Sequence, residues 1–285
     1  MISFRRTSAF LFLLATALPA PPATTSTPRQ GDFPDPDVFM RQVRDAVRLD
    51  YELQSQFTYT EERRDVRISR LGKVEVGPLR TFQVFPSSRP GRTYKRLLAV
   101  DGKPLSAEEL ARRDREHEQH LAEIAAAERR ETPEDRAKRL RKEREELAER
   151  DAILDDALAV FEPAFEARDV IDGQDVFVIT LTPREHARVT TREGGWLKEF
   201  AGRVWIAEAG RQIVKLDLRA KDDVSIGWGI LGRLHEGSRF VFARRRVEGA
   251  WLPAEVIFDA SGRTLLFRSF DVDLVTTYSN YKRIP

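Results

Sequence analysis

Residues 202–224 read GRVWIAEAGRQIVKLDLRAKDDV, and residues 237–281 read GSRFVFARRRVEGAWLPAEVIFDASGRTLLFRSFDVDLVTTYSNY. In both stretches, short runs of β-branched and aromatic residues alternate with turn tripeptides that contain glycine. The expected turns are residues 208–210, 248–250 and 261–263. Strands separated by such turns are typical of an antiparallel meander. These two stretches therefore predict the largest part of a β-sheet.

Side chains in these strands alternate in polarity, as Val214, Leu216 and Leu218 do with the charged residues between them. Because successive side chains of a strand point to opposite faces, one face of the sheet is expected to be apolar and the other polar. Further strands are predicted at residues 57–68, 74–85, 93–100, 165–171 and 175–182. The fold class predicted is therefore α+β, with a large curved antiparallel sheet that forms an open half-barrel of about 10–11 strands.

Two helical segments accompany the strands. Asp35-Pro36-Asp37 comes before apolar residues at helical spacing, which predicts an amphipathic helix over about residues 37–56. A charged helical insertion follows at about residues 105–161, with Ser106 and Thr132 as predicted N-caps. The later part of the insertion carries an apolar stripe that is expected to dock on the sheet: Leu140, Leu147, Ile153, Leu154, Leu158 and Phe161. Both segments are predicted to cover the apolar face.

The N-terminus has the order of a secretory signal peptide. Residues 1–23 contain Arg5 and Arg6, an apolar run and small residues around Pro19. The apolar run is about ten residues long, whereas a membrane-spanning helix needs roughly 20. We therefore predict a cleaved signal at 1–23, a disordered leader at 24–34 and a single domain at 35–285. The protein is expected to be secreted across the inner membrane into the periplasm, with no transmembrane span in its mature form.

Composition excludes several classes of protein. The formal net charge is +2, and removal of Arg5 and Arg6 with the signal leaves about zero. Bulk electrostatics therefore give no support to a nucleic-acid partner. The chain has no cysteine, which excludes a disulfide framework, a thiolate metal site, a cysteine nucleophile and a lipidated N-terminal cysteine.

Glycine-rich segments are interpreted as loops. Residues 227–232 read GWGILG and match the spacing of a dinucleotide-binding loop. A strand follows at 237 onward rather than a helix, so no helix N-terminus is available for a pyrophosphate. Residues 193–195 are likewise expected to form a glycine-bounded loop or turn, and the strand pattern is expected to resume only after Pro163.

No constellation of catalytic or metal-binding residues is evident. His117 and His120 are three positions apart, which differs from the H-E-x-x-H spacing of a zinc helix. His235 stands beside Glu236 and is a candidate general base for a secreted hydrolase, but no nucleophile motif such as G-x-S-x-G accompanies it. We therefore predict a protein that is not an enzyme, with no catalytic residues, no metal and no cofactor.

The apolar face is the remaining candidate for function. A curved sheet that helices cover without filling would form a pocket for a hydrophobic ligand. The alternative is an ordinary packed core beneath the helices. The predicted pocket residues are Phe82, Val84, Phe177, Ile179, Leu181, Phe240, Phe242, Val256, Phe258 and Phe270.

A family resemblance agrees with this reading. Residues 202–206 (GRVWI) and 211–216 (RQIVKL) resemble the hairpin of the LolA/LolB-like lipoprotein-carrier superfamily, whose members include outer-membrane lipoprotein-sorting proteins and sensor domains of envelope stress. The order of helix, strands, helical insertion and meander is also similar to that superfamily. The resemblance implies an open half-barrel with a helical lid that binds lipid or lipoprotein acyl chains in the envelope without a cofactor.

Two other functions remain open at this point. The charged residues 106–150 would suit an envelope protein partner, so that the chain acts as an interaction or sensing module. A secreted hydrolase with its site dispersed over loops is the third possibility.

Overall fold

The computed structural model describes residues 33–69, 73–87, 89, 92–226, 232–264 and 268–284. The predicted signal peptide and most of the predicted leader lie outside these residues. The helices are α1 (Pro36–Gln54), α2 (Ala107–Arg130), α3 (Pro133–Val160) and α4 (Arg192–Leu197). The strands are β1 (Phe57–Ile68), β2 (Val74–Phe85), β3 (Tyr94–Val100), β4 (Lys103–Pro104), β5 (Phe161–Ile171), β6 (Gln174–Pro183), β7 (Phe200–Ala207), β8 (Ile213–Ala220), β9 (Val224–Ile226), β10 (Gly232–Leu234), β11 (Arg239–Val247), β12 (Ala250–Thr264) and β13 (Ser269–Arg283).

The strands form one 13-stranded sheet in the order β4-β3-β2-β1-β13-β12-β11-β8-β7-β6-β5, with β10 and β9 joined to β12. Its strand pairs are antiparallel, and its two ends, β4 and β5, do not meet. The α+β prediction of an open antiparallel sheet is therefore confirmed. The sheet has more strands than expected because β4, β9 and β10, of two or three residues each, are too short to show a pattern in the sequence.

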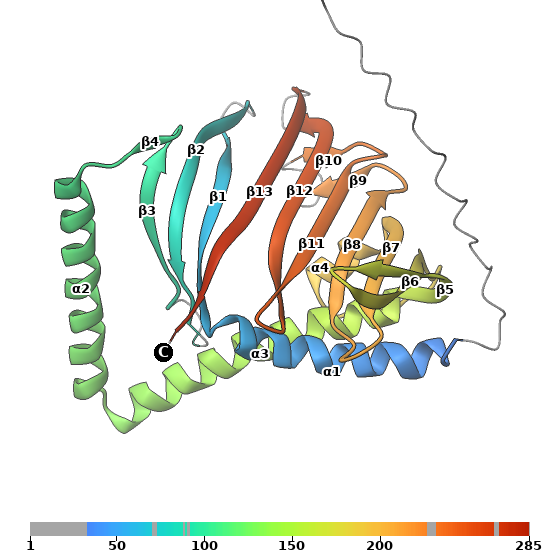
Figure 1. The fold of residues 1–285 in the computed structure, drawn as a ribbon, viewed down its shortest axis with the longest axis horizontal. Helices are drawn as coiled ribbons and strands as arrows, with labels where there is room; N and C mark the ends of the chain where they lie inside the picture. The colour runs from blue at the N-terminus through green and yellow to red at the C-terminus, as the bar shows by residue number, and fades with distance from the viewer. Residues whose placement is uncertain are drawn as a thin grey trace, which may run out of the picture.

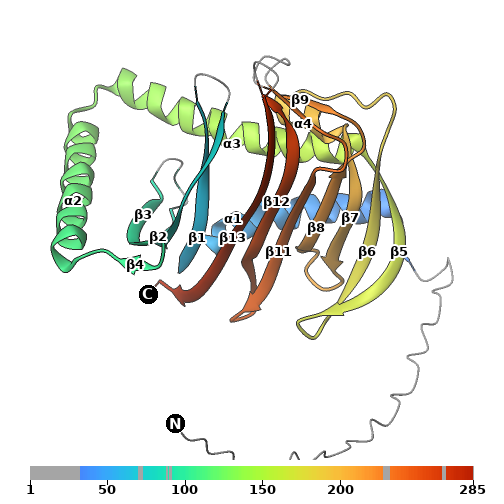
Figure 2. The ribbon, with the colours of Figure 1, turned by 90° about the horizontal axis from the view of Figure 1, so that it is seen from above.

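Helices α1 and α3 lie side by side across one face of the curved sheet, as Figures 1 and 2 show. Two ion pairs join them, Arg44–Asp155 and Arg48–Asp151. Helix α2 stands beyond the edge of the sheet that ends in β3 and β4 (Figure 1). The helical insertion runs directly from β4 to β5, so it connects the two edge strands of the sheet.

The main core lies where α1 and the end of α3 meet β5 to β8. Phe39 and Val43 of α1 and Val160 of α3 are buried against Phe177 and Ile179 of β6. The rings of Phe39 and Phe177 meet edge to face, with centroids 5.3 Å apart. At this end, the packed-core interpretation describes the molecule correctly.

The insertion docks over less of its length than its sequence suggests. The predicted caps are present, since Ser106 accepts from the Glu109 N–H and Thr132 from the Asp135 N–H. Helix α2 has no buried residue. In α3, Leu140 is 41% exposed and Leu147 38%, so the predicted apolar stripe packs only in its last turns.

Three local predictions are wrong. Residues 261–263 were expected to turn, but they continue β12, and a Cβ at Gly262 would come within 2.2 Å of the Arg233 carbonyl oxygen of β10. This glycine therefore serves a close approach of two strands. Residues 193–195 belong to helix α4, which the Thr191 side chain caps. Strand β5 begins at Phe161 and includes Pro163, which is tolerated because β5 is an edge strand.

The GWGILG segment lies mostly outside the described residues, at 227–231. The strands on either side of it, β9 and β10, pair antiparallel with each other. A βαβ crossover is therefore absent from this part of the described chain, as the sequence predicts.

Candidate functional site

The face of the sheet that α1 crosses, here called the inner face, carries a continuous row of apolar side chains. Ile179 of β6 is opposite Val204 of β7, Val204 opposite Leu216 of β8, Leu216 opposite Phe242 of β11, and Phe242 opposite Val256 of β12. Directly opposed residues of paired strands share a face. Five strands thus contribute one row to the inner face.

Strand register places the other predicted pocket residues on this same face. Phe240 is opposite Phe258. Phe258 and Gly262 are four positions apart on β12 and therefore share a face, and Gly262 is opposite Phe270. Phe82 is opposite Glu61, and Glu61 is opposite Tyr278 of β13. Strand register therefore places all ten residues on one side of the sheet, and their role in binding stays a prediction.

Burial divides these ten residues into two groups. Phe177, Ile179 and Leu181 are at most 5% exposed beneath α1, and Val84 is fully buried. The members that stay half-buried lie on the middle of the sheet and toward β2: Phe82, Phe240, Phe242, Val256, Phe258 and Phe270. Phe258 and Phe270 also pack against the cluster around Ala260 and Val272. Only the half-buried group still has apolar surface to offer.

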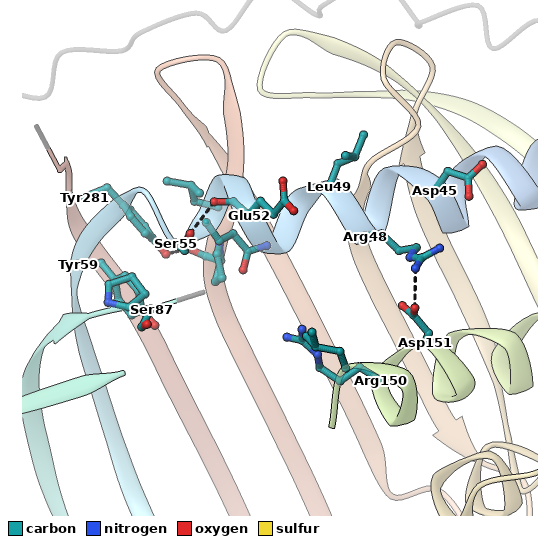
Figure 3. A pocket seen from close by; sticks show the side chains of 15 residues that line it. Asp45, Arg48, Leu49, Glu52, Ser55, Tyr59, Ser87, Arg150, Asp151 and Tyr281 are labelled. Carbon is teal, nitrogen blue, oxygen red and sulfur yellow. Dashed lines mark hydrogen bonds and ion pairs between the residues drawn. The ribbon is translucent and has the colours of Figure 1, made fainter. Parts of the chain in front are cut away.

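A pocket of about 680 Å³ lies beside this face, between α1, α3 and the ends of β1, β12 and β13 (Figure 3). Tyr59, Tyr281 and Leu252 line its apolar side, and Arg48 and Arg150 belong to its charged side. Sequence reasoning missed this pocket because its lining comes from segments far apart in the chain. The alternation of strand β1 was the one available sign of this pocket, because it places Tyr59 on the same face as Glu61.

The pocket adjoins the inner face through aromatic and charged side chains. Tyr59 is opposite Val84 and meets Tyr278 with ring centroids 5.8 Å apart. Glu61, only 2% exposed, accepts from Lys95 Nζ at 2.7 and 2.9 Å. Burial, followed by the charge of Glu61, raises the pKa of Tyr59 to about 12. Tyr59 is therefore a neutral hydroxyl at physiological pH.

A second charged pair lies on the inner face beneath α1. Arg244 follows Phe240 and Phe242 on the same side of β11 and is 6% exposed. Its Nη1 donates to Asp50 Oδ2 at 2.6 Å and to the Ile213 carbonyl at 2.9 Å. Burial raises the pKa of Asp50, and the Arg244 charge opposes that rise only in part.

Arg244 was not predicted as a site residue. It stands in the run Arg244-Arg245-Arg246, which resembles a solvated charged surface. Its spacing from Phe240 and Phe242 was the available signal, because every second residue of a strand shares a face.

Two of the histidines that the sequence singles out make structural contacts. The ring of His117 stacks on Tyr94 with centroids 3.5 Å apart. Ser238 Oγ donates to the carbonyl oxygen of His235, not to its ring. Among the residues that the structure describes, no three His, Asp or Glu side chains gather as metal ligands. None of the described helices has the length and apolar character needed to cross a membrane.

No protein-family model matches the sequence, and no curated protein matches it. Among solved structures, the chain matches a DUF1329 family protein from Desulfovibrio piger with 13% identity and a TM-score of 0.28, over 88% of this chain and 94% of that one. It matches a LolA superfamily protein from Nitrosomonas europaea with 11% identity and a TM-score of 0.28, over 85% and 94% of the two chains.

A structure of MucB in complex with MucA(peri) also matches, with 10% identity and a TM-score of 0.22, over 87% of this chain and 99% of that one. A LolA superfamily structure is thus among the solved structures that the chain matches.

Proposed function

We propose that this chain is an exported protein of the bacterial envelope that binds a hydrophobic ligand on the inner face of its sheet, without catalysis. The ligand class is a lipid or an acyl chain. The observation that carries the proposal is the half-buried apolar surface around Phe240, Phe242, Val256 and Phe258, which strand pairing places side by side. An acyl chain on this surface would remove it from water.

Burial of this surface by a ligand would favour binding. Complete burial of one Phe or Val side chain contributes about 1.5–3 kcal/mol. Completing the burial of several half-buried side chains thus contributes a few kcal/mol before the entropic cost of association. The pocket beside Tyr59 offers an entry from solvent because it opens between α1 and α3.

Binding of an uncharged, environment-sensitive alkyl probe tests the proposal. Phe242→Ser should weaken binding about tenfold or more, because it removes apolar surface from the centre of the row. Val275→Ser is the matched control, since Val275 is 41% exposed on the opposite face, where it pairs with Ile257. Absence of probe binding by the wild type, or equal loss in both variants, would contradict the proposal.

The helical insertion supports a second candidate, a surface for an envelope protein partner. Helix α2 has no buried residue and is held to the sheet edge by Arg96–Asp114 and by the stacking of Tyr94 on His117. The double variant Glu118→Lys/Glu123→Lys, at two exposed positions of α2, should then abolish capture of that partner and preserve binding of the alkyl probe. Unchanged capture would exclude this role.

A further inference from the structure

We propose that the ligand of the inner face carries a carboxylate, and that this carboxylate binds the Nε and Nη2 edge of Arg244. This inference rests on the proposed function and assigns the ligand class, a long-chain carboxylic acid. The Nε and Nη2 atoms of Arg244 are buried, and no described residue supplies either of them with a hydrogen-bond acceptor. A buried charged donor without an acceptor is costly to a folded protein.

Other arginines of this chain show what that edge binds. Arg44, Arg96, Arg139, Arg203 and Arg239 each donate from Nε and Nη2 to the two oxygens of one carboxylate. In Arg239 the two distances to Asp217 are 2.8 and 2.5 Å. This fork matches a carboxylate in both shape and charge. Arg244 presents the same fork with no carboxylate of the described chain on it.

Asp50 does not occupy the fork, because it contacts the opposite end of the guanidinium. Asp50 Oδ2 accepts from Nη1, which also donates to the Ile213 carbonyl. These contacts fix the plane of the guanidinium and leave its Nε edge for another acceptor. The guanidinium is therefore held in place, and because its Nε and Nη2 atoms are closed off from solvent, the side chains around Arg244 must move to admit a carboxylate.

Arg244 lies at the end of the apolar row on β11, where the head group of a bound acyl chain would be. Phe240, Phe242 and Arg244 share one side of β11 at intervals of about 7 Å. A chain lying along the two phenylalanines thus ends at the guanidinium. The apolar row receives the tail, and the fork receives the acid.

Binding of a ligand carboxylate requires one protein group to take up a proton. A second carboxylate at Arg244 would leave one uncompensated negative charge beside Asp50. Burial already raises the pKa of Asp50, so this residue takes up the compensating proton. Tyr281 of β13 also interacts electrostatically with Arg244, and burial raises its pKa, so it stays neutral.

A comparison of hexadecanoic acid with hexadecanol tests the inference, each competing with the alkyl probe. The wild type should bind the acid at least about tenfold more tightly than the alcohol, the effect of hydrogen bonds to a charged group. The double variant Asp50→Asn/Arg244→Gln replaces the pair with neutral groups of similar size, which avoids an unpaired buried charge. It should bind the alcohol as the wild type does and lose the preference for the acid.

The matched control is Asp217→Asn/Arg239→Gln, which neutralises an ion pair on the opposite face of β11. It should keep the preference for the acid. Equal binding of acid and alcohol by the wild type, or an undiminished preference in the Asp50/Arg244 variant, would overturn the carboxylate site and leave the hydrophobic site standing. Failure of both compounds to displace the probe would contradict the proposed function itself.

Discussion

Asp50 of α1 and Arg244 of β11 are 194 positions apart in the sequence, yet they form a buried ion pair of 2.6 Å. The side chains are 6% and 3% exposed. The pair fixes the C-terminal half of α1 over the middle of the sheet, next to the apolar row.

Asp50→Ala should destabilise the fold by about 3–5 kcal/mol, because it leaves the buried guanidinium of Arg244 without its counter-ion. The measurement is the free energy of unfolding in urea. Glu166→Ala is the control, since the Glu166–Arg203 pair is 39% and 55% exposed and should contribute no more than about 1 kcal/mol. Similar losses of unfolding free energy in the two variants would show that the Asp50–Arg244 pair stabilises the fold no more than an exposed ion pair does.

Asp156 should make the free energy of unfolding decrease as the pH becomes acidic. Burial acts to raise its pKa, but hydrogen bonds from Thr191 and Thr190 outweigh burial and lower the pKa below 3.8. A carboxyl with a depressed folded-state pKa stabilises the fold above its unfolded pKa, and this stabilisation is lost as pH falls through the folded value.

Asp156→Asn should therefore be less stable than the wild type at neutral pH, and the difference should shrink as pH falls below about 4. The measurement is urea unfolding of both proteins across pH 2–7. A difference that stays constant over this range would refute the assignment of the acid-side loss to Asp156.

Gly262→Ala should destabilise the fold by about 1–3 kcal/mol, the usual cost of overpacking. The added Cβ would meet the Arg233 carbonyl oxygen at 2.2 Å and the Phe270 ring at 2.6 Å. Gly195→Ala serves as the comparison, because no heavy atom lies within 4 Å of its Cβ position in helix α4. Thermal unfolding should separate the two variants, with Gly195→Ala at or above the wild type.

Asp114→Asn should loosen α2 without unfolding the sheet. Asp114 receives the Arg96 guanidinium at 2.7 and 2.6 Å, and α2 has no buried residue, so polar contacts such as this one attach it. Amide hydrogen exchange should quicken across α2 and remain unchanged in β11 to β13. Unchanged exchange in α2 would mean that the stacking of His117 on Tyr94 and the ion pairs of Glu128 with Arg89 and Arg92 suffice to dock this helix.

The elements that sequence reasoning found are those whose signal is local. The capping side chains of Ser106 and Thr132 act within a few residues, and both predictions match the structure. Alternation along β8 holds for Leu216 and Leu218, but it is wrong for Val214, because a register shift between β7 and β8 places Val214 in the cluster of Val176 and Trp251. The turn expected at Gly262 is wrong because glycine occurs both in turns and where two strands come unusually close. Only the position of β10 beside Gly262 distinguishes these two cases.

The site shows the same limit. Alternation assigned Phe242 and Val256 to the correct face, but the depth of burial depends on which helix covers them. The contact between Asp50 and Arg244 depends on the path of α1 over β11, which no local pattern contains.

Because the helical insertion starts at β4 and ends at β5, the two free margins of the sheet are tethered by a segment of fixed length. Each helical turn added to or removed from it changes its span by about 5.4 Å. The number of residues between Leu105 and Val160 thus limits how far the two margins of the sheet can move apart.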